Sequence, residues 1–198
     1  MAERKIIMRR IRGLKIPIRY YDIEKKIRKN SIDLVSIFGR DDVESNLKNF
    51  ISTLASYLKI TLIYDTFEPS KDEILKEIVY DKKSPYASFG FITLGSYIDE
   101  KKKSIDDSEI AIFNIFIDVV SQTVFDTTKD IIDEEAKKEK LQVGDILFIY
   151  EPHKKLTQAT YHLYNILNPS SDGIELKDEM IFPLNSWLIA VPWIASRK

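Results

Sequence analysis

The sequence predicts a single α+β domain. Three observations support this fold class. The chain has 198 residues, enough to bury a core without a disulfide or a metal. Its composition, with 44% hydrophobic and 31% charged residues, is typical of a globular protein. Segments with helical and with strand periodicity are mixed along the whole length, and neither a Pro/Gly/Ser-rich linker nor an internal repeat divides them. We therefore expect one domain over residues 1–198.

The first half of the chain contains both kinds of element. Pro17 indicates an edge strand, because proline cannot donate a hydrogen bond to a neighbouring strand. Asp41 and Asp42 are suited to cap a helix whose apolar residues recur at helical spacing. The segment 72–79 fits either a short helix or an extended stretch. We expect strands over 5–20, 60–67 and 87–94, and helices over 21–29 and from 43 to 58.

The second half is dominated by one long helix, expected from Ser108 to Lys140 because no Pro or Gly interrupts it. Its polar residues include a stripe at spacings of three and four, which places them on one side of the helix. That stripe could hold a general base or bind a cationic ligand, and a solvated helix face explains it equally well. Its members are Asp118, Gln122, Asp126, Asp130 and Asp133. Downstream we expect a strand from 144 to 150, a helix over 156–167, and strands over 174–176, 180–182 and 187–193.

Basic residues are concentrated at the start of the chain. Residues 1–30 hold eleven Lys and Arg against three acidic residues, a net charge of +8, whereas the whole chain has −1, so the remainder carries −9. One interpretation is a basic arm for nucleic acid or another polyanion. The other is a solvated face on an edge strand and the first helix. We favour the second, because the basic residues alternate with isoleucines and leucines as in a strand.

The composition excludes several classes of site. The chain has no cysteine, which rules out disulfides, thiolate metal sites, a cysteine nucleophile and an iron–sulfur cluster. Its two histidines, His153 and His162, cannot complete a structural zinc site alone, and no phosphate-binding glycine loop or hydrolase motif is present. We expect no metal and no catalytic residue. No apolar run of about 20 residues occurs, so we expect no membrane span and a cytoplasmic location.

A few aromatic and histidine residues are open to two interpretations. His153 follows the strand that ends at Tyr150, at a position suited to a ligand-binding loop. The alternative is a loop histidine with no functional role. His162 lies inside a helix, where packing is expected. Trp187 and Trp193 are an even number of residues apart on one strand, so they share a face. We expect them in the core, with an aromatic wall for a flat ligand as the second possibility.

The order of segments resembles the activation domain of vitamin B12-dependent methionine synthase. The most specific similarity is at 91–99, a strand followed by Gly95 and Asp99, and at 180–186, which has the pattern Met-x-x-Pro-x-x-Ser. The other similar segments are 14–18, 49–64, the long helix at 107–140, and 156–174. The resemblance covers most of the chain.

The resemblance implies a twisted antiparallel sheet surrounded by helices, with one long central helix. It also implies binding of S-adenosylmethionine, and a partner, the cobalamin-bearing module of a methyltransferase. In that family the domain presents the methyl donor when inactive cobalamin is reduced, so that the chemistry belongs to the cofactor and the domain supplies position. Cobalamin would reach this chain only through the partner.

The sequence departs from the family at the donor-binding motif. The family has Arg-x-x-Pro-Gly-Tyr, whereas Leu147, Glu151 and Pro152 stand here in place of its arginine, glycine and tyrosine. Asp126 falls where the family's central helix has a glutamate facing the donor. We therefore expect either an altered binding mode through Asp126, Tyr150, Glu151 and His153, or a non-catalytic interaction module that has lost the ligand and docks an acidic partner on its basic N-terminal face.

Overall fold

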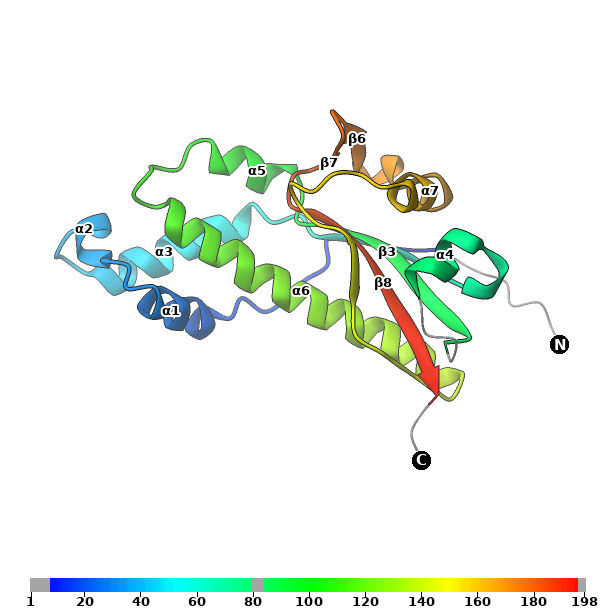
Figure 1. Cartoon of the computed structure of the whole chain (residues 1–198). Helices are drawn as coiled ribbons and strands as arrows, with labels where there is room; N and C mark the ends of the chain where they lie inside the picture. Colours follow the sequence, from blue (N-terminus) through cyan, green and yellow to red (C-terminus); the bar gives the residue numbers. More distant parts are fainter. Residues whose placement is uncertain (1–7, 80–83, 196–198) are drawn as a thin grey trace.

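The computed structural model describes residues 8–79 and 84–195 (Figure 1). The helices are α1 (Tyr20–Lys29), α2 (Leu34–Phe38), α3 (Val43–Ser56), α4 (Glu73–Ile78), α5 (Ser96–Lys102), α6 (Ile110–Lys138) and α7 (Gln158–Leu167), with short 3₁₀ turns η1 (Pro69–Lys71) and η2 (Pro169–Asp172). The strands are β1 (Arg9–Arg12), β2 (Thr61–Phe67), β3 (Tyr86–Thr93), β4 (Leu141–Val143), β5 (Leu147–Tyr150), β6 (Glu175–Lys177), β7 (Met180–Phe182) and β8 (Ser186–Ala195).

An antiparallel sheet organises the molecule. Its strand order is β1-β2-β3-β8, and the far edge of β8 pairs first with β5 and then, further along, with β4. The central pair is long and regular, with Tyr86 opposite Trp193 and Thr93 opposite Ser186. β6 and β7 form a separate hairpin. The expected α+β fold, an antiparallel sheet with one long helix, is confirmed.

Both faces of the sheet are covered, so the molecule has two cores. Alternate residues of β2, β3 and β8 point to opposite sides, as the pleat requires. Leu62, Ile92 and Ile189 face the core under α1, α3 and α6. Phe89 and Leu188 face the core under α4, α7 and the β6–β7 hairpin. The helices on the two sides of the sheet are visible in Figure 1.

The helix α6 crosses the whole of the first core. Eleven of its residues are buried, among them Phe113, Phe116 and Val124. In the described part of the chain it is the one helix long and apolar enough to span a membrane. A core helix meets the same criterion, and here its apolar side chains pack against the sheet. Trp187 and Trp193 lie in this core too, on one face of β8 as expected.

The basic N-terminal segment is tied to the domain. β1 is an edge strand, as the alternation predicted, but it spans only Arg9–Arg12; Pro17 lies in the irregular segment 14–19 that follows, where a strand was expected. Its arginines bind acidic groups of distant elements: Arg9 Nε lies 3.1 Å from Glu135 Oε1, and Arg10 and Arg12 both bind Asp172. The predicted strand residues 5–7, and the basic residues before them, lie outside the described residues.

The structure also differs from the expected elements in places. The segment 72–79 contains a short helix, α4, and α6 ends at Lys138, with β4 following it. The helices α2 and α5 and the strand β4 were not expected. Asp42 precedes α3 at the N-cap position, yet its side chain makes no capping hydrogen bond.

Candidate functional site

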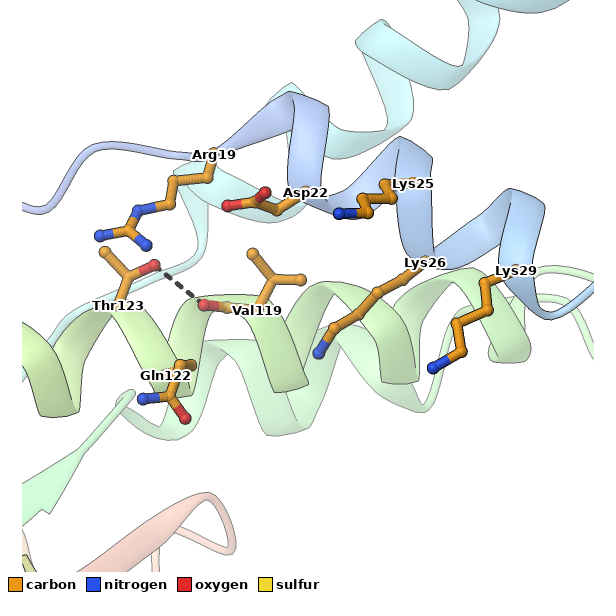
Figure 2. Close-up of a pocket in the computed structure, with 8 residues that line it drawn as sticks. All are labelled: Arg19, Asp22, Lys25, Lys26, Lys29, Val119, Gln122 and Thr123. Carbon is orange, nitrogen blue, oxygen red and sulfur yellow. Dashed lines mark hydrogen bonds between the residues drawn. The ribbon is translucent and has the colours of Figure 1, made fainter.

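A basic groove runs between α1 and α6 (Figure 2). It encloses about 280 Å³. Its lining residues are Arg19, Asp22, Lys25, Lys26, Lys29, Val119, Gln122 and Thr123. Figure 2 shows the side chains of Arg19, Lys26 and Lys29 reaching from α1 toward α6.

The groove follows from the way α1 packs. Ile23 and Ile27 are one turn apart and buried, which holds one side of α1 against the core and leaves its lysines outside. Arg19 approaches Asp126 at 3.7 Å, and Lys26 forms an ion pair with Asp118. Because Arg19 precedes Lys26 while Asp126 follows Asp118, the two helices are antiparallel at the groove.

The floor and rim of the groove differ in chemistry. Val119 and Thr123 form an uncharged floor, where the Thr123 hydroxyl donates to the Val119 carbonyl at 2.9 Å. Lys25 and Lys29 are exposed, and neither forms an ion pair with a described acidic side chain. The rim therefore keeps uncompensated positive charge, which favours an anionic group in a bound ligand.

Asp126 lies at the Arg19 end of the groove. Its side chain is half exposed and accepts a hydrogen bond from Gln122 Nε2 at 3.0 Å, and Gln122 itself lines the groove. A carboxylate and a guanidinium thus stand side by side at one end, where the predicted polar stripe of α6 meets the start of α1. Of the four predicted ligand residues, Asp126 is the one that the structure places beside this hollow.

The other three predicted residues lie elsewhere. Tyr150 is buried in the second core, and its hydroxyl accepts a hydrogen bond from the Ile181 amide at 3.2 Å. Glu151 forms an ion pair with Lys154. His153 is exposed in a loop and has a φ of 67°, in the left-handed region.

The direction of the side chains along β5 explains this separation. Phe148 points toward α6 and packs against Phe125 at a centroid distance of 5.0 Å, whereas Tyr150 points to the opposite side of the sheet. The four predicted residues therefore do not converge on one site. Sequence reasoning missed the groove residues Arg19 and Gln122 as partners of Asp126, although the basic start of the chain and the polar stripe of α6 were both visible.

Aromatic residues form a chain from the core to the surface. Trp187 is buried and packs edge-on against Phe125 at 5.3 Å, and Phe125 contacts Phe148, which is 44% exposed. Trp193 is fully buried and donates to the Ser88 hydroxyl at 3.0 Å. Both tryptophans therefore have core roles, as first expected, and Phe148 is the aromatic residue that reaches solvent.

A comparison with protein-family models and with curated proteins finds no match. The family resemblance therefore depends on the segments named above.

The two most specific of those segments lie next to each other. Thr93 pairs with Ser186, and the Leu94 amide donates to the Asn185 carbonyl at 3.0 Å. Asp99 accepts hydrogen bonds from the Leu184 amide at 2.5 Å and from Asn185 Nδ2 at 2.6 Å. Burial raises the pKa of Asp99, and these hydrogen bonds offset part of the rise. The cluster joins the start of α5 to the start of β8.

Proposed function

We propose that this chain is an S-adenosylmethionine-binding accessory domain that serves the reductive reactivation of cobalamin in a B12-dependent methionine synthase or a related corrinoid methyltransferase. The observation that carries the proposal is the pairing of Asp126 with Arg19 at the groove between α1 and α6. The family resemblance supplies the identity of the ligand.

The charges at this end of the groove suit that ligand. S-Adenosylmethionine carries a sulfonium and an ammonium group, which are cationic, and a carboxylate, which is anionic. Asp126 and Asp22 offer carboxylates to the cations, and Arg19 offers a guanidinium that can bind a carboxylate through two hydrogen bonds. Both partners are partly exposed, so a ligand can replace their mutual contact at little cost.

The neighbouring segments 93–99 and 180–186 give a second line of support. They are far apart in sequence, and they carry the most specific part of the resemblance. Their contact through Asp99 and Asn185 is consistent with two parts of one structural motif. The chain would hold the methyl donor, and the partner protein would carry the cobalamin at which the methyl group is transferred.

The test is a calorimetric titration of the full chain with S-adenosylmethionine and with S-adenosylhomocysteine, which lacks the sulfonium charge. We expect the first to bind more tightly, and Asp126→Asn to reduce this preference by about tenfold, because a nearby carboxylate favours the cation. Asp130→Asn, a change one turn further along α6, is the matched control. Absence of binding at millimolar S-adenosylmethionine would reject the proposal.

A second candidate function is a non-catalytic interaction module that docks an acidic protein segment. It is supported by Lys25 and Lys29, which are one helical turn apart on the rim and lack described acidic partners. Nucleic acid fits less well, because six of the nine basic residues in the described segment 8–30 are already paired with acidic groups and the chain beyond residue 30 is net negative. A long polyanion such as nucleic acid would extend beyond the basic segment and be repelled by the negative charge of the remaining chain.

This candidate is tested with a fluorescent oligoglutamate peptide. We expect binding that weakens steeply with added salt, and a loss of at least about tenfold in affinity in Lys25→Glu/Lys29→Glu. The control is Lys103→Glu/Lys138→Glu, which makes the same change of charge at exposed sites outside the groove. An equal loss in both double variants would indicate an effect of net charge alone and would contradict docking in the groove.

A further inference from the structure

A second hollow lies between the segment that joins β1 to α1 and the end of α3. It encloses about 390 Å³, a volume suited to a small ligand. Its lining residues are Gly13, Leu14, Lys15, Ile16, Ile18, Ala55, Leu58 and Ile60. It has no lining residue in common with the groove between α1 and α6, so the two are separate features of the surface.

The hollow forms because the chain parts from the sheet after β1. The last contact with the neighbouring chain is made by the Leu14 amide, which donates to the Ile60 carbonyl at 3.0 Å. Beyond it, residues 15–19 have no regular structure. Neither the Lys15 amide nor the Ile16 amide donates to a described backbone carbonyl. This segment therefore keeps backbone donors that a bound group can use.

The walls of the hollow are aliphatic. Leu14, Ile16 and Ile18 alternate along the segment, and all three are half-buried against the edge of the first core. Ala55 and Leu58, at the end of α3, are half-buried as well. Covering the exposed remainder of such side chains gains about 25 cal/mol for each Å² of apolar surface removed from water. The walls therefore favour an aliphatic group.

The charge at the hollow is positive. Among the described lining residues Lys15 is the only charged one; it is exposed and forms no ion pair with a described acidic side chain. Lys59 stands between the lining residues Leu58 and Ile60 and is exposed too. Its Nζ lies 4.2 Å from the centroid of the Tyr97 ring, and no described carboxylate pairs with it. The rim therefore favours an anionic group.

We propose that this hollow binds an aliphatic monocarboxylate. The hydrocarbon tail lies against Leu14, Ile16 and Leu58, and the carboxylate lies beside Lys15. The two parts of such a ligand match the two parts of the hollow, because the walls are apolar and the charge at the rim is uncompensated. The Lys15 ammonium and the free backbone amides supply the hydrogen-bond donors that a carboxylate requires. The volume limits the tail to a medium length.

The first test is a calorimetric titration of the full chain with octanoate, octanol and octylamine, which have the same tail and different head groups. We expect octanoate to bind most tightly and octylamine least tightly. Lys15→Glu should reverse this order and weaken octanoate binding by at least about tenfold, because the carboxylate then meets a like charge. The control is Lys103→Glu, which makes the same change of charge at an exposed site outside the hollow.

A second pair of variants tests the position of the tail. Ala55→Leu fills the hollow from the side of α3, so it should weaken octanoate and octanol alike by at least about tenfold. Ser52→Leu, an exposed change about one turn earlier on the same helix, should leave both affinities unchanged. Circular dichroism and thermal unfolding establish that each variant is folded.

Three results would overturn the proposal. The first is absence of octanoate binding at millimolar concentration. The second is equal affinity for the three head groups or an undiminished affinity in Ala55→Leu, since either would indicate unspecific partition of the tail. The third is binding to phosphatidylserine vesicles without binding of soluble octanoate, because the hollow would then recognise a lipid surface and not a free carboxylate.

Discussion

At the scale of single residues, Asp172 joins the first described strand to the second core. Its carboxylate is buried and accepts hydrogen bonds from Arg10 and from Arg12 Nε, the latter at 2.5 Å. Arg10 also donates to the Leu167 and Asn168 carbonyls at the end of α7, at 3.1 and 3.2 Å. Burial alone would raise the pKa of Asp172, but the hydrogen bonds from Arg12, Ser171 and Arg10 outweigh it and lower this pKa.

Replacing Asp172 should make stability less dependent on pH. A carboxyl group with a lowered folded pKa stabilises the fold above its unfolded pKa of about 3.9, and this contribution is lost as the pH falls through the folded pKa. We expect Asp172→Asn to reduce the free energy of unfolding by about 2 kcal/mol near neutral pH, and by less at an acidic pH below the usual aspartate pKa. Urea unfolding at the two pH values measures this difference.

Asp107→Asn is the control for this prediction, because Asp107 is exposed and has no described partner. A constant difference between wild type and Asp172→Asn across the whole pH range would contradict the predicted role of the ionised carboxylate.

At the scale of elements, α7 is fixed at its start by side chains. Thr157 Oγ1 accepts from the Thr160 amide at 3.3 Å, and Thr160 Oγ1 accepts from the Thr157 amide at 3.2 Å, which forms a capping box. His162, one turn on, contacts Asp72 Oδ2 at 2.7 Å, and Asp72 in turn caps α4. The start of α4 and the second turn of α7, two helices that cover the second core, are thereby linked.

We expect Thr157→Ala to reduce the free energy of unfolding by about 1 kcal/mol, because the Thr160 amide then loses its capping acceptor. Ser52→Ala, an exposed change within α3, is expected to have almost no effect. Chemical denaturation of both variants measures the two values. Equal stability of Thr157→Ala and wild type would show that water satisfies the amide just as well.

At the scale of the whole molecule, the sequence was informative about elements whose patterns are local. The apolar runs of β2, β3 and β8 were visible because both faces of these strands are buried. The helix α5 was missed because it has only seven residues, four of them charged, and β4 was missed because its three residues fall between the expected helix, which ended at Lys140, and the strand expected from 144. Periodicity cannot resolve elements this short.

The site was predicted less completely because it depends on contacts between distant segments. The stripe on α6 placed Asp126 correctly on the polar side of the helix. That Arg19 stands beside it depends on the antiparallel packing of α1 on α6, which no local pattern encodes. Regular alternation would place Tyr150 on the same face as Phe148, but a register shift between these two residues turns Tyr150 to the opposite face, and no local pattern indicates that shift. The burial of Tyr150 under α7 therefore required the three-dimensional arrangement.

The pairing of β3 with β8 also has a consequence for the order in which the protein is synthesised. The two strands are neighbours in the sheet, yet Tyr86 and its partner Trp193 are separated by ~100 residues of sequence. While a ribosome adds α5, α6 and α7, β3 can pair only with β2, and its other edge stays open. The sheet is completed when β8 emerges after all the other described elements. During translation the edge of β3 that will pair with β8 therefore stays unpaired until the end of the chain has been made. A chaperone would be of most use at this nascent stage.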